Sequence, residues 1–356
     1  MTTPFDHGGT VFAVARQLGV APEVLLDFSA SINPLGPPPG VREAVTAAFD
    51  RLVHYPDSDA TELILALSRC HGLAPEQVCA ANGSTELIYL LPRLVPGRRA
   101  LVVAPPFSEY GRSLQRAGWE TEYFPLSPED GFALDVNDLA DCLAAKYDML
   151  LLGNPGNPTG RLYRREEIVP VLDLCRATGT FPVLDEAFMD FCEEESAKEL
   201  VAGGEGLVLR SMTKFYAIPG LRLGYAIGRQ DVIARLAALR EPWSVNTLAQ
   251  VAGVAALADA DYARRTREYV AAERQWFSAT LSELPGIRVY PSAANYLLLE
   301  SVGMSASEIG RRLLAERMLI RECCSFPGLN DRFFRVAVRA RAENEKLRLG
   351  LAGVLV

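Results

Sequence analysis

The chain has few of the features on which several classes of protein depend. Only three histidines occur among 356 residues, so a zinc cluster has little to build from. No apolar run approaches the roughly 20 residues of a membrane span, and no basic start followed by an apolar stretch marks a signal peptide. The net charge is −8, and there is no long basic run. We therefore expect a cytoplasmic protein that binds no metal, nucleic acid or membrane.

Two reactive arrangements are also missing. The seven cysteines are scattered, odd in number and contain no Cys-x-x-Cys pair, which favours reduced thiols over disulfides. No Gly-x-Ser-x-Gly turn is present, which argues against a serine hydrolase of the α/β class. What remains is an ordinary composition, 49% hydrophobic and 22% charged, in a chain long enough for two domains.

Short apolar strands alternate with amphipathic helices between about residues 77 and 228. Continuous apolar strands separated by helices predict an α/β fold with a mainly parallel sheet covered on both faces. Ligand sites in such sheets form at the carboxyl ends of the strands. The predicted strands are Val78–Ala81, Ala100–Ala104, Met149–Leu152, Phe181–Leu184, Leu207–Leu209 and Leu223–Ile227.

The two ends of the chain depart from this alternation. Residues 1–45 are rich in proline and glycine and predict an extended arm, followed by a large domain over 46–258. Residues 259–356 begin with a long helix, continue with short strands and end with a helix from about 343 to 355. This order predicts a smaller α+β domain that the N-terminal arm joins.

Lys214 is the first candidate catalytic residue. It follows the strand Leu207–Leu209 together with Ser211 and Thr213, and Arg222 comes eight residues later. The amine can form a Schiff base with the aldehyde of pyridoxal 5'-phosphate (PLP), while the two hydroxyls and the guanidinium can reach its phosphate. A lone lysine is usually a solvated surface charge, so the rest of the chain must supply the site.

Other strand ends supply matching residues. Asp185 can pair with the pyridine nitrogen of PLP, and Asn157, in a turn with two Asn-Pro steps, can donate to the ring hydroxyl. Ser84 and Thr85 open a helix whose N-terminus can bind phosphate, and Phe107 can stack on the ring. Taken singly, these residues are equally well a turn, helix caps and a core phenylalanine. Asn157, Asp185 and Lys214 recur about every 28 residues, each near a strand end, which indicates one shared PLP site.

The C-terminal part offers two arginines for a doubly anionic substrate. Arg321 and Arg335 lie 14 residues apart at or near short strands, and guanidinium groups suit carboxylate and phosphate. Taken singly, each is as well explained as a surface arginine in a salt bridge.

The chain resembles the fold-type I PLP enzymes of the aminotransferase superfamily, in the branch of histidinol-phosphate aminotransferases and threonine-phosphate decarboxylases. The resemblance covers nearly the whole chain and includes the N-terminal His7-Gly8-Gly9 typical of the decarboxylases. The stretches that carry it are residues 7–9, 26–36, 55–57, 209–222, 242–246, 294–296, 319–321 and 334–337.

The resemblance implies a large domain with a seven-stranded sheet, and a homodimer with shared active sites. Lys214 would be the Schiff-base lysine and Asp185 the partner of the ring nitrogen. Tyr55 would reach the cofactor phosphate of the partner subunit. Arg335 would bind the substrate carboxylate, and Arg321 with His7 the substrate phosphate. Asn33 and Asn157 would also contact the substrate.

Three positions depart from the pattern of the relatives. Phe188 replaces a tyrosine that donates to the ring hydroxyl, which leaves Asn157 to do so alone, while Ser31 and Ser84 replace an expected asparagine and glutamate. The implied reaction is decarboxylation of L-threonine O-3-phosphate, a step of cobalamin biosynthesis. Transamination of histidinol phosphate or a similar amino phosphate stays open, because both reactions use the same site. A PLP-fold regulatory module is a distant third, since the chain has no basic surface or appended DNA-binding domain.

Overall fold

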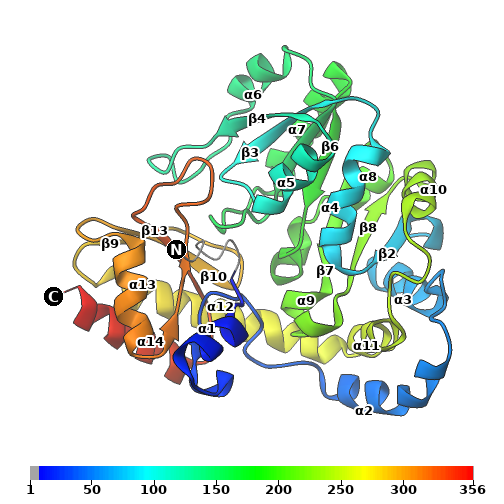
Figure 1. Cartoon of the computed structure of the whole chain (residues 1–356). Coiled ribbons are helices and arrows are strands. Elements are labelled where there is room, and N and C mark those ends of the chain that lie inside the picture. Colours follow the sequence, from blue (N-terminus) through cyan, green and yellow to red (C-terminus); the bar gives the residue numbers. More distant parts are fainter. Residues whose placement is uncertain (1–7, 356) are drawn as a thin grey trace.

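The computed structural model describes residues 8–355. It has a large and a small part, each built from a β-sheet and the helices that pack on it (Figure 1). The large sheet has seven strands in the order β2-β8-β7-β6-β5-β3-β4. All neighbours from β7 to β4 are parallel, and β8 alone runs antiparallel to both of its neighbours. The predicted seven-stranded, mainly parallel sheet is therefore confirmed. Its strands are β2 (Val78–Ala81), β3 (Arg99–Ala104), β4 (Glu120–Pro125), β5 (Met149–Gly153), β6 (Phe181–Asp185), β7 (Leu207–Ser211) and β8 (Gly224–Gly228).

Both faces of this sheet are buried, which explains why its strands are continuous apolar runs. Alternate residues of one strand enter two different cores: Val102 packs with one set of helices, and Leu101 and Val103 with the other. The first face is covered by α4 (Gly83–Leu94), α5 (Ser108–Arg116) and α10 (Gln230–Leu239). The second is covered by α3 (Thr61–His71), α6 (Val136–Leu143), α7 (Arg165–Thr178), α8 (Lys198–Ala202) and α11 (Thr247–Leu257).

The C-terminal part forms a four-stranded antiparallel sheet in the order β12-β13-β10-β9. A third hydrophobic core packs against this sheet. In it, Phe28 from the N-terminal arm packs with Phe277, Phe334 and Leu347. Its elements are α12 (Ala260–Ser282), β9 (Ile287–Val289), β10 (Tyr296–Ser301), α13 (Ala306–Ala315), β11 (Met318–Leu319), β12 (Arg321–Glu322), β13 (Phe333–Ala337) and α14 (Arg341–Val354).

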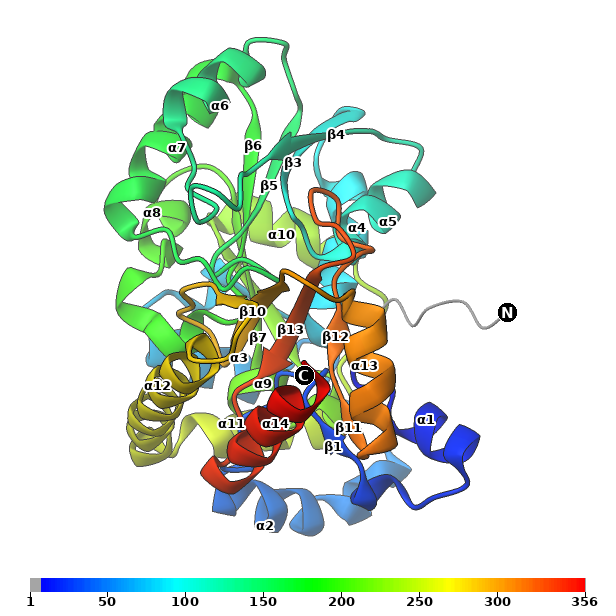
Figure 2. The same cartoon turned by 90° about the vertical axis from the view of Figure 1, so that its left-hand side faces the viewer.

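The N-terminal arm lies against this smaller part. Its strand β1 (Leu26–Asp27) pairs in parallel with β11, and α1 (Val11–Leu18) lies beside the same elements (Figure 2). The chain then crosses to the large sheet, where α2 (Pro39–Ala47) packs on α11. Within residues 8–355, no helix is both long enough and apolar enough to cross a membrane.

Candidate active site

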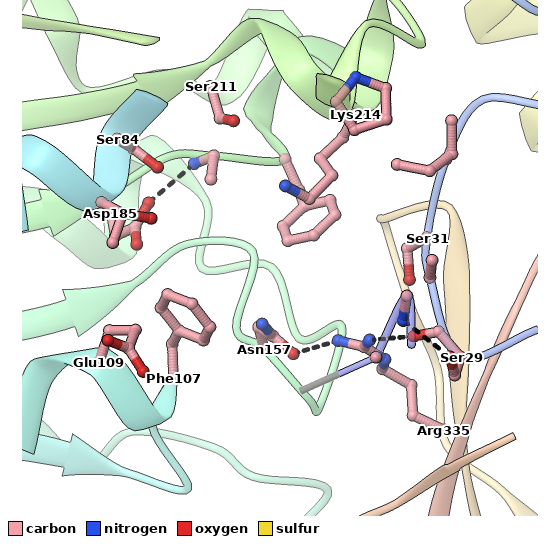
Figure 3. A pocket seen from close by; sticks show the side chains of 18 of the residues that line it. Ser29, Ser31, Ser84, Phe107, Glu109, Asn157, Asp185, Ser211, Lys214 and Arg335 are labelled. Carbon is pink, nitrogen blue, oxygen red and sulfur yellow. Dashed lines mark hydrogen bonds between the residues drawn. The ribbon is translucent and has the colours of Figure 1, made fainter. Parts of the chain in front are cut away.

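A cavity of about 650 Å³ opens where the large sheet meets the arm and the small sheet. Its walls come from segments that follow the carboxyl ends of β3, β5, β6 and β7, together with α4, the arm and β13. Figure 3 shows Asp185, Phe107, Asn157, Lys214 and Arg335 around this one space. The sequence placed these residues at separate strand ends, and the fold brings them together.

Lys214 lies on the short helix α9 (Met212–Phe215), which begins where β7 ends. Its Nζ donates to Thr213 Oγ1 over 2.7 Å. Burial lowers the pKa of Lys214 to about 8; the Arg222 and Arg335 charges also lower it, while the Asp185 carboxylate opposes them. A substantial fraction of neutral amine is therefore present near physiological pH, as a nucleophilic lysine requires.

Asp185 ends β6 and is buried. Its Oδ2 accepts from the Tyr110 hydroxyl at 2.6 Å, and its Oδ1 accepts from the Ala187 backbone N–H at 3.0 Å. Burial raises the pKa of Asp185, while these two donors and the Lys214 charge lower it. The carboxylate is thus oriented by the protein and borders the cavity, where it can pair with a cationic ring nitrogen.

A site that could bind a phosphate lies where α4 begins. Gly83 has φ +75°, and a Cβ there would lie 2.6 Å from Arg222 Nη2. Across the sheet, a Cβ at Gly224 would lie 2.4 Å from the Ser84 backbone nitrogen. Two glycines thus allow the helix N-terminus and the Arg222 guanidinium to approach each other closely. Backbone N–H groups with a cation beside them form an anion site.

The predicted hydroxyl ligands lie at this same end of the cavity. Ser84, Thr85 and Ser211 line it, and Ser211 Oγ lies 2.8 Å from Thr213 Oγ1. Phe107 precedes α5 and borders the cavity as well, with its ring edge-on to Tyr110 at 5.8 Å between centroids. The lysine, the buried carboxylate, the anion cradle and the aromatic wall together fit PLP.

Arg335, on β13, lines the cavity from the side of the small sheet. It is buried, its Nη2 donates to the Ser29 carbonyl over 2.9 Å, and its Nη1 donates to Asn157 Oδ1. Burial lowers the pKa of Arg335, and the two groups that accept hydrogen bonds from it are neutral. Arg335 also lines the cavity, where an anionic group of a ligand would balance the charge of this buried guanidinium.

Arg321 and Tyr55 lie outside the lining of this cavity. Arg321 pairs with Arg335 across β12 and β13, is buried, and donates to Ser325 Oγ over 3.1 Å. Tyr55 is 78% exposed and stacks on Trp243 with 4.5 Å between ring centroids. An exposed tyrosine beside an exposed tryptophan is available to another subunit, whereas it does not reach the cavity of its own chain.

One predicted substrate residue has a different role. The Asn33 amide is buried and donates to the Phe215 carbonyl, to Tyr262 Oη and to Thr266 Oγ1 at 2.8 to 3.0 Å. It therefore fixes the arm against α9 and α12 and lies outside the lining of the cavity, so its contact with a substrate stays a prediction. His7 lies outside the described residues, although Gly8 and Gly9, which follow it, do line the cavity.

The sequence reasoning missed three residues that border the site: Tyr110, Glu109 and Ser29. Tyr110 could have been found, because it stands three residues after Phe107 on the same face of a predicted helix. Ser29 could not, because its contribution to Arg335 is a backbone carbonyl, which any residue carries. Phe188 also lines the cavity, with its ring centroid 6.0 Å from Lys214 Nζ, and offers no hydroxyl there.

Comparison with known proteins agrees with this geometry. The chain matches the family model of class I and II aminotransferases over residues 23–353. It is 42% identical to a threonine-phosphate decarboxylase of Salmonella typhimurium, over 98% of this chain and 96% of the relative. A histidinol-phosphate aminotransferase of Roseiflexus castenholzii is 36% identical, over 94% and 91% of the two chains.

A solved structure gives the same result at the level of the fold. The L-threonine-O-3-phosphate decarboxylase of Porphyromonas gingivalis superposes with a TM-score of 0.83 at 28% identity, covering 93% of this chain and 99% of the other. The chain therefore belongs to the class I and II aminotransferase family, the fold-type I enzymes that the sequence resembled.

Proposed function

We propose that this protein is a PLP-dependent enzyme that decarboxylates L-threonine O-3-phosphate. The products are CO₂ and (R)-1-amino-2-propanol O-2-phosphate, which serves cobalamin biosynthesis. The observation that carries the proposal is the 42% identity to a threonine-phosphate decarboxylase over almost the full length of both chains. The site supports it, because a reactive lysine, a buried carboxylate and a buried arginine meet in one cavity.

When bound, PLP supplies an electron sink for the bond at the substrate Cα that stands perpendicular to its ring. Lys214 Nζ is the amine that holds the cofactor, and its lowered pKa provides the neutral form that this bond needs. The same atom is placed to return a proton to Cα after CO₂ leaves. Asp185 holds a negative charge toward the ring nitrogen, and Asn157 offers its amide to the ring hydroxyl.

The cofactor phosphate belongs at the N-terminus of α4. Ser84, Thr85 and Ser211, which line the cavity, supply hydroxyls, as does Thr213, which is hydrogen-bonded to Ser211. Arg222 supplies the positive charge beside Gly83. Phe107 covers the ring. These assignments use every predicted cofactor residue of one chain, and Tyr55 of the partner subunit completes the set.

The two substrate arginines decide which Cα bond breaks. Arg335 takes the carboxylate. Arg321, which lies outside the cavity lining but directly beside Arg335 in the small sheet, takes the phosphate together with His7. Because the phosphate is anchored on the small sheet, the substrate can be turned so that the bond from Cα to the carboxylate stands perpendicular to the ring. Holding that carboxylate in the ring plane would instead expose the C–H bond and favour transamination.

We also propose a homodimer with shared sites, located in the cytoplasm. The exposed Tyr55–Trp243 pair supports the dimer, because two stacked aromatic rings on a surface are suited to a protein contact. All seven cysteines are unpaired, as in a reducing compartment.

Product analysis tests the reaction. The purified protein, loaded with PLP, is incubated with L-threonine O-3-phosphate, and we expect CO₂ and 1-amino-2-propanol phosphate without any added keto acid. A second incubation contains histidinol phosphate and 2-oxoglutarate. Rapid glutamate formation there, with no CO₂ from threonine phosphate, would assign the chain to the aminotransferases.

A further inference from the structure

The hydroxyl of Tyr110 is one of two groups that donate hydrogen bonds to the Asp185 carboxylate among the described residues. The O–H···O distance is 2.6 Å, and the other donor, the Ala187 N–H, lies 3.0 Å from the second carboxylate oxygen. A distance of 2.5–2.7 Å is typical of a hydrogen bond to a charged oxygen, which is about twice as strong as one between neutral groups. Tyr110 is therefore the stronger of the two donors.

Tyr110 also remains a donor over the whole working range of pH. It is buried, at 3% exposed, and burial raises its pKa well above the usual value, as do the Asp185 charge and the hydrogen bond itself. The other ionisable groups that act on Asp185 or Tyr110 are Lys214 of α9 and Tyr296 of β10. Neither of them donates a hydrogen bond to the carboxylate, so within residues 8–355 the Tyr110 hydroxyl alone donates to Asp185 Oδ2.

The position of Tyr110 is a consequence of local geometry. Phe107 caps α5, and residues three apart on a helix lie on one face. Both residues therefore border the cavity, and the Tyr110 hydroxyl reaches Asp185 at the end of β6, with the two rings edge-on at 87°. One turn of helix thus supplies both the aromatic wall and the donor to the carboxylate.

We propose that Tyr110 is a positioning residue that orients Asp185 and keeps it ionised toward the cofactor ring. This inference deepens the proposed function and rests on it for the cofactor. In a buried site, desolvation alone favours the neutral carboxylic acid, which could not form an ion pair with a protonated ring nitrogen. The hydrogen bond from the Tyr110 hydroxyl offsets this tendency, because it lowers the pKa of Asp185.

The first experiment needs no cofactor. The pKa of Asp185 is measured by ¹³C NMR of carboxyl-labelled aspartate in the PLP-free protein, with the resonance assigned through Asp185→Asn. We expect Tyr110→Phe to raise this pKa by about 1–2 units, the value that corresponds to loss of a ~1.5–3 kcal/mol hydrogen bond to a charged group. The matched control is Tyr163→Phe, since Tyr163 is equally buried and its hydroxyl donates to the Phe132 carbonyl, away from Asp185.

The second experiment separates positioning from general stability. Affinities for PLP and for its analogue with carbon in place of the ring nitrogen are compared in wild type and Tyr110→Phe. We expect the variant to bind PLP several-fold more weakly than the wild type does. The difference should be largest between the two Asp185 pKa values, where Asp185 is protonated in the variant and ionised in the wild type. Binding of the analogue should be unchanged. An unchanged Asp185 pKa, or equal losses for both ligands, would overturn the inference. A wild-type protein that binds no PLP would instead refute the proposed function and leave the NMR result standing.

Discussion

Nη1 of Arg335 donates a hydrogen bond to Oδ1 of Asn157. The first residue belongs to the small sheet and the second to the turn after β5 of the large sheet, so the bond joins the two parts of the molecule across the cavity. The bond also sets the orientation of the Asn157 side-chain amide. Because its oxygen accepts from Arg335, its NH₂ group points away from Arg335 and can donate to another group. A residue proposed to bind the cofactor is thus hydrogen-bonded to one proposed to bind the substrate.

Removal of Arg335 should impair every amino-acid substrate, because all of them carry the carboxylate. Arg321→Ala should mainly impair phosphorylated substrates. Loss of a partner from a buried charge pair costs about 2–5 kcal/mol, so the effects on kcat/KM should be large. Steady-state kinetics with phosphorylated and unphosphorylated threonine measure them. Arg332→Ala, at an exposed arginine that pairs with Glu300, is the control; equal losses for both substrates in both variants would contradict the assignment.

Lys214 should be the site of covalent attachment. We expect the purified protein to be yellow, and borohydride treatment followed by peptide mapping should place the cofactor on Lys214. Lys214→Ala should lose both the visible absorbance and the labelled peptide, whereas Lys346→Ala, on the exposed side of α14, should keep them. A label recovered on another lysine would remove the central assignment.

The lowered pKa of Lys214 gives a pH dependence with a defined sign. A lysine pKa of about 8 means that the neutral, reactive amine increases as the pH rises through that value, well before an ordinary lysine would react. In PLP-free protein, the rate of Lys214 carbamylation by cyanate, followed by mass spectrometry, should show this midpoint. Asp185→Asn should lower the midpoint further, because the carboxylate favours the charged amine. Arg222→Gln should raise it, and shifts of the same sign in both variants would be inconsistent with this electrostatic account.

The sequence predicted the large sheet well because its strands are buried on both faces. Val102 and its neighbours in β3 show this pattern of consecutive apolar residues. It missed β4, whose residues Glu120–Pro125 are mostly exposed at the sheet edge and carry no such signal. The sequence also did not predict the break between two short C-terminal strands, where the chain leaves β11 at Leu319 and enters a different sheet at Arg321.

The site residues divide in the same physical way. Lys214 and Asp185 could be predicted because they follow apolar strands, and the carboxyl ends of parallel strands meet at one edge. The role of Asn33 in fixing the arm could not be predicted. It depends on contacts with residues 182 to 233 positions away, and the sequence of a proline-rich segment carries no signal for such contacts. Tyr110 was overlooked because a tyrosine on an amphipathic helix usually packs in a core, and its ring does so here. Only the position of its hydroxyl identifies its role.

Tyr55 should act in the site of the partner subunit. A mixture of Lys214→Ala and Tyr55→Ala chains, unfolded and refolded together, should regain activity that neither variant has alone. Each mixed dimer would hold one intact site, so random pairing should restore about one quarter of the wild-type activity. Separate refolding of each variant is the control. A mixture that stays inactive although mixed dimers form, or an active monomer in sedimentation experiments, would contradict shared sites.

Gly83 should be required for binding of the cofactor phosphate. Alanine at this position would place its Cβ 2.6 Å from Arg222 Nη2, so the guanidinium must shift from its position beside the N-terminus of α4. Loss of one hydrogen bond to a charged group, about 1.5–3 kcal/mol, corresponds to at least about tenfold weaker PLP binding in a fluorescence titration. Gly72→Ala is the matched control, because Gly72 has a similar φ of +66° and no atom within 4 Å of an added Cβ. Both variants should lose roughly 1–2 kcal/mol of folding stability from the left-handed backbone. Only Gly83→Ala should lose PLP affinity, and equal affinity in the two variants would mean that the phosphate is bound elsewhere.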